Sequence, residues 1–348
     1  MLTVLDHVPE GLLTVPPTDL HRVLSGPTLC HLDGVRPEPL FVSVLLHGNE
    51  TTGLLAVQEL LQRHQGQRLP RALSLLIGNI AAARHEQRHL HGQPDYNRIW
   101  CGEGGDEFAM AQVVLQEMIE RRVFAAVDVH NNSAPNPHYA IVTRLDPPSL
   151  KLARLFSDQV VFSTQPNSMQ SSAFGEVCPA VTIECGIPGD PAGTQRSRLF
   201  LQHVLELGEL PLEFDPEEPM TLYRIVATIT IPEGLSFGFA PGEGEALVLS
   251  VDPPRQNFQV VAKGTVWGTC SREEGHRFRV TDENHRDVFA RYFVWEEGRI
   301  KAACDLIPAM LTWNHQIIRQ DCLGYLLERV RYFPLPEATI IDQRVGGL

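Results

Sequence analysis

The sequence predicts an α/β protein whose sheet is covered by helices on both faces and is followed by a smaller, mainly β domain. Over roughly the first two hundred residues, short apolar runs alternate with segments whose apolar residues recur at helical spacing, which is the pattern of an α/β sheet. Beyond an acidic, proline-rich stretch at residues 210–219, the pattern becomes β. We therefore expect one domain at residues 1–210 and a second at 220–348.

The elements of the first domain follow from these runs in order. The apolar run at residues 39–46 predicts a strand, and the helical spacing of leucines and valines at 51–64 predicts a helix, with Thr51 and Thr52 as candidate caps. Further strands are expected at 72–77, 123–127 and 181–184, and further helices at 106–122, 148–159 and 195–207.

The second domain is expected to consist mainly of strands. Its segments are rich in β-branched and aromatic residues and are bounded by turn residues. The expected β segments are 223–231, 246–251, 258–262, 278–281, 288–295 and 317–319.

Composition narrows the class of protein. With 43% hydrophobic and 20% charged residues among 348, the chain has the composition of a globular protein. Its formal net charge of -13 argues against a nucleic-acid partner, since such proteins carry clustered Lys and Arg. The seven cysteines form no CxxC pair, which favours reduced thiols. No signal-peptide or membrane-spanning pattern is apparent, so we expect a cytoplasmic protein without a membrane partner.

Candidate metal ligands follow the predicted strands. His47 and Glu50 come directly after the first run, His130 follows the run at 123–127, and Glu184 ends the run at 181–184. A single His or Glu in such a place is more often an ordinary polar residue of a loop. Three strand ends of this kind favour a site, because ligands bind at the carboxyl edge of open α/β sheets. Two imidazoles and one carboxylate, with a fourth position open, are a ligand set of catalytic zinc.

This pattern resembles the zinc carboxypeptidase superfamily and, within it, the aspartoacylase and succinylglutamate desuccinylase branch. The resemblance covers residues 38–210 and implies a carboxypeptidase-like mixed sheet flanked by helices, with one Zn²⁺ per chain. The short interval between the first ligand pair and the Asn-Arg segment favours the acylase branch over the digestive carboxypeptidases. The branch has an HxxE pair, a D-x-N-R segment, a D-x-H histidine and a T-x-E-x-G glutamate, which are matched here by His47 and Glu50, Asp95 to Arg98, His130, and Glu184.

The resemblance also implies roles. His47, Glu50 and His130 would hold the metal, while Glu184 would act as the general base and pass its proton to the leaving nitrogen. Asp95 would accept a hydrogen bond from the second ring nitrogen of His47; the alternative is a turn residue. Arg98, which we also count among the catalytic residues, would anchor a substrate carboxylate together with Asn97; the alternative is a surface ion pair.

Two positions depart from the branch. Where aspartoacylases have an arginine before the Asn-Arg pair, this chain has Leu90, so the arginine that would stabilise the transition state stays open between Arg84, Arg88 and another. Where they have an arginine that reads the acidic side chain of the substrate, this chain has Phe174. N-acetylaspartate is therefore not the expected substrate.

Three functions remain as hypotheses. The first is a zinc-dependent deacylase of an N-acyl amino acid or a related carboxylate-bearing amide. The second is a carboxypeptidase-like metallopeptidase acting on peptide carboxyl ends, including acidic or γ-linked peptides. The third is a metal-stabilised binding module, which Glu184 argues against because such a module needs no base. The expected partner is a small molecule or short peptide with a free carboxylate; a homo-oligomer is left open, and the β domain is expected to cap the site.

Overall fold

The computed structural model describes residues 2–213, 219–240, 245–272, 275 and 277–331, and these residues form two units. The first unit contains the chain up to Asn131 and from His138 to Leu222. The second contains Asn132–Pro137 and Tyr223–Val330. The domains expected at 1–210 and 220–348 stay a prediction, and residues 332–348 of the second lie outside the described residues.

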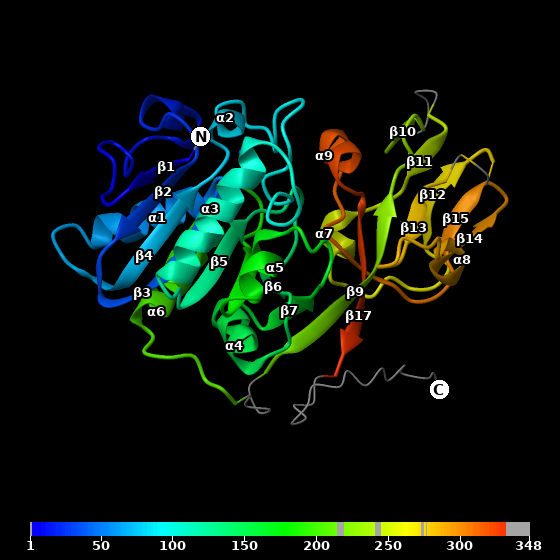
Figure 1. The fold of residues 1–348 in the computed structure, drawn as a ribbon. Helices are drawn as coiled ribbons and strands as arrows, with labels where there is room; N and C mark the ends of the chain where they lie inside the picture. Colours follow the sequence, from blue (N-terminus) through cyan, green and yellow to red (C-terminus); the bar gives the residue numbers. More distant parts are fainter. Residues whose placement is uncertain (1, 214–218, 241–244, 273–274, 276, 332–348) are drawn as a thin grey trace. The chain divides into compact units, whose positions relative to one another are not determined.

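A mixed sheet runs through the first unit (Figure 1), with the order β1-β2-β4-β3-β5-β8-β6-β7. Adjacent strands are parallel except for the pairs β2 with β4 and β6 with β8. The strands are β1 (Thr3–Leu5), β2 (Thr28–Leu32), β3 (Gly34–Val44), β4 (Leu69–Ile77), β5 (Ala125–His130), β6 (Tyr139–Val142), β7 (Gln159–Phe162) and β8 (Ala180–Glu184).

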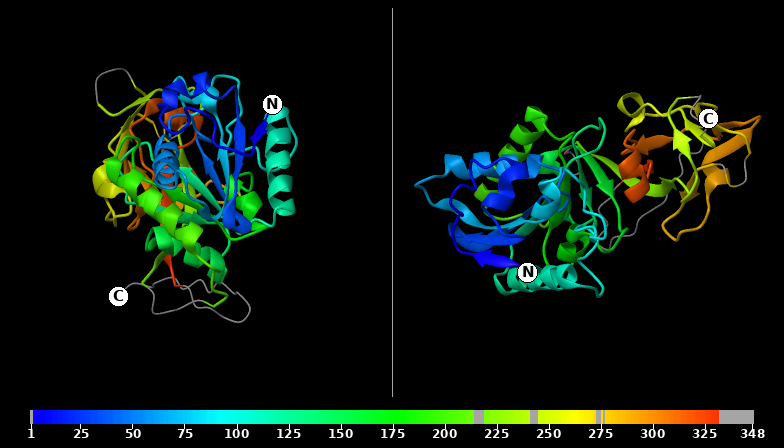
Figure 2. Two further views of the ribbon diagram at one scale, coloured as in Figure 1. Left: turned by 90° about the vertical axis from the view of Figure 1, so that its left-hand side faces the viewer. Right: turned by 90° about the horizontal axis from the view of Figure 1, so that it is seen from above.

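Helices cover both faces of this sheet. Helices α1 and α6 contact each other on one face, and α3 lies on the opposite face (Figure 2). Buried residues of α3, such as Met110 and Val114, pack with Phe41 and Leu76 of the strands. The fold class expected from the sequence is thus confirmed. The helices are the 3-10 helix η1 (Pro17–Arg22), α1 (Thr52–Arg63), α2 (Ile80–Ala83), α3 (Asp106–Glu120), α4 (Pro147–Phe156), α5 (Gln170–Gly175) and α6 (Pro191–Glu206).

The centre of the sheet places three strand ends side by side. Strands β3, β5 and β8 are consecutive neighbours and run parallel. Val44 is in register with Val129, and His130 is in register with Glu184. Because parallel neighbours end at the same edge of a sheet, residues that follow β3 and those that end β5 and β8 meet there.

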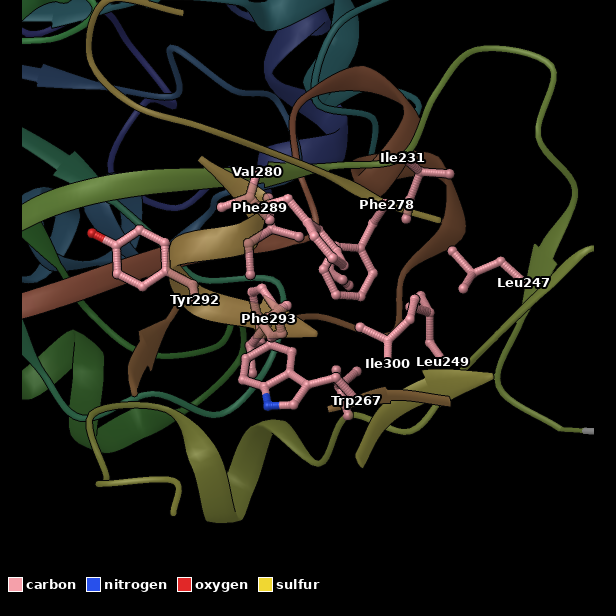
Figure 3. Close-up of a cluster of buried hydrophobic side chains, with 14 of the residues drawn as sticks. Ile231, Leu247, Leu249, Trp267, Phe278, Val280, Phe289, Tyr292, Phe293 and Ile300 are labelled. Carbon is pink, nitrogen blue, oxygen red and sulfur yellow. The ribbon is translucent and has the colours of Figure 1, made fainter. Parts of the chain in front are cut away.

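The second unit contains two groups of strands around an aromatic core. Strands β9, β17 and β16 pair in that order with β13 beside β9, and a second sheet has the order β10-β11-β12-β15-β14. Phe278, Phe293 and Trp267 are fully buried and pack edge to face (Figure 3). The elements are β9 (Thr221–Thr230), β10 (Phe237–Gly238), β11 (Leu247–Leu249), α7 (Pro253–Gln256), β12 (Val266–Cys270), β13 (Arg279–Thr281), α8 (Phe289–Tyr292), β14 (Phe293–Glu296), β15 (Arg299–Ala302), β16 (Ile307–Ala309), α9 (His315–Gln320) and β17 (Gly324–Val330).

Three expected strands of this unit were wrong in whole or in part. The segment 317–319 lies in α9, because the Asn314 side chain accepts hydrogen bonds from the backbone N–H groups of Gln316 and Ile317 and so caps a helix. The segment 258–262 forms only a bridge between Val261 and Leu306. The segment 288–295 begins as the short helix α8 before it continues as β14.

Among the residues that the structure describes, no helix combines the length and the apolar composition that a membrane span needs.

Candidate active site

His47, Glu50 and His130 converge at the carboxyl edge of the sheet. The Nδ1 atom of His47 lies 2.8 Å from Oε1 of Glu50, and the Nδ1 atom of His130 lies 2.7 Å from Oε2 of the same carboxylate. One donor atom from each of the three residues lies within 4.8 Å of the others, and all three side chains are buried. The structure therefore brings together the three residues that the sequence predicts as metal ligands.

The electric field at this cluster favours positive charge. Burial by itself would lower the pKa of both imidazoles, but Asp128 and Glu50 hold the pKa of His130 well above its ordinary value. The pKa of His47 is raised as well, because Glu50 and Asp95 outweigh burial and the charge of Arg88. Burial would raise the pKa of Glu50, yet the two histidines keep it below its usual range. A cation among these groups is electrostatically favoured.

The donor set fits zinc. Both histidines direct Nδ1 toward one carboxylate, and imidazole nitrogen with carboxylate oxygen is a usual zinc ligand set. Each second ring nitrogen already contacts a carboxylate oxygen, an arrangement that orients ligand histidines in zinc proteins. The cluster therefore has the ligand types and the outer carboxylates that fit a zinc ion held by two histidines and one glutamate.

The residues behind the histidines are Asp95 and Asp128. The Nε2 atom of His47 lies 2.9 Å from Oδ1 of Asp95, which is the contact that the sequence predicts. The Nε2 atom of His130 lies 2.6 Å from Oδ2 of Asp128, a partner that the sequence analysis missed. The signal was available, since residues two apart on a strand point to the same face.

Glu184 stands beside the cluster on the neighbouring strand. It is the register partner of His130, so both side chains project on the same face of the sheet. Burial raises the pKa of Glu184 to about 7, and the charges of Glu50 and Asp128 act in the same direction, while His130 and His47 oppose them. This carboxyl group is therefore poised to exchange a proton near neutral pH.

Asn97 and Arg98 lie on the loop that follows Asp95. The Nδ2 atom of Asn97 lies 3.3 Å from Nε2 of His130, and its Oδ1 accepts a hydrogen bond from the backbone N–H of Gln170. Arg98 donates from Nη1 to the carbonyl oxygen of Asn97 at 2.9 Å and acts electrostatically on Asp95. Both residues are thus close to the cluster, and Arg98 is half-buried rather than a free surface side chain.

The structure places Arg84 and Arg88, the two named candidates for the arginine that would stabilise the transition state, in different environments. Arg88 is buried, donates to Asp95 from Nε and Nη2, and has its Nη1 4.0 Å from Oε1 of Glu50. Arg84 is exposed. Of these two candidates, Arg88 is the one that adjoins the candidate metal ligands.

Phe174 belongs to the hydrophobic core. Its ring stacks on Phe41 with centroids 4.4 Å apart, and Trp100 packs against it edge to face. The side chain is fully buried among apolar neighbours. The position that carries a substrate-reading arginine in aspartoacylases is here part of the packing under the sheet.

Asn131 is a second residue that the sequence analysis missed. Its backbone N–H donates to Oε2 of Glu50, and its side chain bonds both Thr52 and the carbonyl oxygen of Gly186. Its Oδ1 also accepts from the N–H of Thr52 at 3.1 Å. Asn131, rather than the hydroxyl of Thr51, therefore satisfies the start of α1, and it ties the loops after β3 and β8 together.

Comparisons with known proteins agree with this geometry. Residues 39–207 match the sequence model of the succinylglutamate desuccinylase/aspartoacylase catalytic domain. The fold is similar to that of a succinylglutamate desuccinylase from Chromobacterium violaceum, with a TM-score of 0.55, 17% identity, and coverage of 85% of this chain and 86% of the other. No curated protein sequence matches the chain significantly.

Two further solved structures share the fold. A succinylglutamate desuccinylase/aspartoacylase from Rhodobacter sphaeroides has a TM-score of 0.54 at 14% identity, covering 86% of this chain and 88% of its own. Murine aminoacylase 3 has a TM-score of 0.53 at 16% identity, covering 85% of this chain and 96% of its own. At these identities the likeness concerns the fold.

Proposed function

Because residues 39–207 belong to the succinylglutamate desuccinylase/aspartoacylase family, we propose that this protein is a zinc-dependent hydrolase that removes the acyl group from an N-acyl amino acid. The observation that carries the proposal is the convergence of His47, Glu50 and His130 on one point, with Glu184 in register beside them. A metal-binding module would have no use for a buried carboxyl group whose pKa is about 7.

The proposed chemistry divides between the ion and the chain. His47, Glu50 and His130 would hold one zinc ion, which when bound polarises an amide carbonyl and makes water more acidic. Glu184 takes a proton from the attacking water and gives it to the nitrogen of the departing amine. Burial suits Glu184 to this task, because it raises the pKa of this carboxyl group to about 7.

Arg98 supports a substrate with a free carboxylate. Arg98 lies on the loop that places Asn97 next to His130. A substrate carboxylate bound to its guanidinium would bring the amide of the substrate toward the proposed metal ligands. A guanidinium binds a carboxylate through paired hydrogen bonds. Asn97 lines the same loop and would contribute to holding this end of the substrate.

The buried Phe174 limits the substrate further. Since its ring packs on Phe41, no charged group from this position reads a second carboxylate. We therefore propose an amino acid with a single carboxylate, without a second acidic group on its side chain.

The test is a substrate screen with zinc-loaded, full-length protein. We would assay N-acetyl, N-succinyl and longer N-acyl derivatives of neutral, basic and acidic amino acids, together with short peptides that have free carboxyl ends. Hydrolysis of N-acyl derivatives of non-acidic amino acids is the expected result. Cleavage restricted to the carboxyl ends of peptides would replace this proposal with a peptidase, and no turnover of any compound by zinc-loaded protein would refute it.

A further inference from the structure

Each candidate ligand histidine ends a chain of three hydrogen-bonded side chains. His47 contacts Asp95 at 2.9 Å, and Asp95 is in turn held by Arg88. His130 contacts Asp128 at 2.6 Å, and Asp128 is in turn held by Ser43. The two carboxylates therefore do not stand alone behind the histidines.

Ser43 closes the chain behind His130. Its hydroxyl donates to Oδ1 of Asp128 at 2.7 Å, which leaves Oδ2 for His130. Ser43 on β3 and Asp128 on β5 are register partners in adjacent parallel strands, and neither is exposed to solvent. The rigid centre of the sheet thus fixes the orientation of this carboxylate.

Arg88 closes the chain behind His47. Its Nε and Nη2 donate to Oδ2 of Asp95 at 3.1 and 2.9 Å, while Oδ1 of Asp95 faces His47 and accepts from the backbone N–H of Asn97 at 2.7 Å. Hydrogen bonds between charged groups of this kind are among the stronger ones in proteins. Arg88 therefore holds Asp95 in one orientation.

We propose that Ser43 and Arg88 are positioning residues of the metal centre, each acting on one ligand histidine through a carboxylate. This inference rests on the proposed function, since it assigns the cluster to a metal. By orienting Asp128 and Asp95, the two residues place the ring proton of each histidine on Nε2 and leave Nδ1 of each ring facing Glu50. Neither residue touches the substrate or the metal in this assignment.

The two hydrogen-bonded chains end in different groups, the guanidinium of Arg88 and the hydroxyl of Ser43. The guanidinium of Arg88 offsets much of the charge of Asp95, whereas the hydroxyl of Ser43 is neutral and leaves the charge of Asp128 intact. A carboxylate that keeps its charge makes the imidazole bonded to it a better metal donor. We therefore expect His130 to be the stronger donor of the two histidines.

The first experiment compares Ser43→Ala with Ser74→Ala in the full-length protein. Ser74 is the matched control, because it is also a buried strand serine bonded to a histidine, 2.9 Å from Nδ1 of His31, and its histidine is not part of the cluster. Zinc affinity is measured by competition with a chromophoric chelator, and the environment of the ion is followed through the visible spectrum after Co²⁺ substitution. Melting temperatures without metal report the loss of a buried hydrogen bond.

Outer partners of metal ligands typically contribute 10-fold to 100-fold in affinity, and Ser43 acts one residue further out. We expect Ser43→Ala to weaken zinc binding roughly tenfold and to shift the Co²⁺ spectrum, while Ser74→Ala changes neither. Ser43→Thr, which keeps the hydroxyl, should recover the affinity lost in Ser43→Ala. Equal zinc affinities and spectra for the two alanine variants would overturn the assignment of Ser43.

A second pair of variants tests the hydrogen-bonded chain from Arg88 to His47. Arg88→Met increases the net negative charge of Asp95 but frees its orientation, and because we expect the loss of orientation to dominate, zinc binding should weaken roughly tenfold. Arg88→Lys should recover part of this loss because it restores a charged donor to Asp95 without the planar fork. The exposed Arg84 provides the control, Arg84→Met, which should bind zinc like the parent. Unchanged affinity in Arg88→Met would overturn the assignment of Arg88, and the Ser43 pair remains informative if Arg88→Met does not fold.

Measurements on the parent protein distinguish a failure of the positioning roles from a failure of the proposed function. If the parent binds zinc and hydrolyses N-acyl amino acids while every variant binds zinc equally well, the positioning roles fail and the proposed function stands. If the parent binds no zinc, the proposed function fails together with the positioning roles.

Discussion

His130 and Glu184 are register partners at the ends of two adjacent parallel strands. A candidate metal ligand and a carboxyl group with a raised pKa are thereby held on the same face of the sheet by backbone hydrogen bonds rather than by a loop. This relationship makes the role of Glu184 testable separately from the metal.

Replacing Glu184 should remove catalysis and leave the metal in place. A base of this kind contributes about 100-fold to 10,000-fold, so Glu184→Gln is expected to lower kcat by at least about 100-fold with zinc content unchanged. Steady-state kinetics and metal analysis of the purified variant check both statements. Glu176→Gln, at an exposed glutamate, is the control, and a variant of Glu184 that retains parental kcat would remove the residue from the mechanism.

The pH dependence of activity follows from the same group. Glu184 must be ionised to accept a proton, and burial raises its pKa to about 7, so kcat/KM should rise with pH along an acid limb. A divalent ion next to the carboxyl group stabilises its anion, so the midpoint of the limb should lie at or below about 7. A pH profile of the zinc-loaded protein measures it. An acid limb with its midpoint clearly above neutrality would contradict this assignment.

Glu184 should also make the metal-free protein less stable as the pH rises. In the unfolded chain the carboxyl ionises near its ordinary pKa, whereas in the folded protein the pKa is about 7, so the folded state binds more protons in between and loses stability as the pH increases through this interval. Glu184→Gln removes this loss. In the presence of chelator, its melting temperature should exceed that of the parent at pH 8, with a smaller difference at pH 5. A difference independent of pH would contradict the raised pKa.

Metal removal provides a further prediction. Treatment with a chelator should abolish hydrolysis, and zinc should restore it, because His47, Glu50 and His130 supply the ligand set. Zinc should also raise the melting temperature, since a ligand that binds the folded state stabilises it. His130→Ala should lose both effects. His64→Ala, at a half-buried histidine outside this cluster, should keep both.

Arg98 should control substrate binding. If it binds the substrate carboxylate, Arg98→Met removes charge-assisted hydrogen bonds that contribute about 1.5 to 3 kcal/mol, which corresponds to roughly 10-fold to 100-fold in kcat/KM. We expect most of this loss in KM, with zinc affinity close to that of the parent. Arg144→Met, at an exposed arginine with surface partners, is the control. A loss confined to kcat would instead assign Arg98 to the transition state.

Sequence patterns predicted the central strands and the longer helices of the first unit, because these elements depend on local spacing, whereas the strands β1, β2, β6 and β7 were not predicted. The helical spacing at 51–64 became α1 (Thr52–Arg63), and the apolar run before His47 became the end of β3 (Gly34–Val44). The positions of His47, Glu50, His130 and Glu184 at strand ends followed from the same runs, since neighbouring parallel strands must end at one edge.

The partners of these residues were decided only by the tertiary structure. Ser43 reaches Asp128 through strand pairing, Arg88 reaches Asp95 through the folding of a loop, and Asn131 satisfies the start of α1 from the loop that follows β5. These hydrogen bonds join residues that no local period relates, so the sequence alone carries no signal for them. Sequence spacing determined which side chains arrive at the edge of the sheet, and strand register and loop packing determined what holds them there.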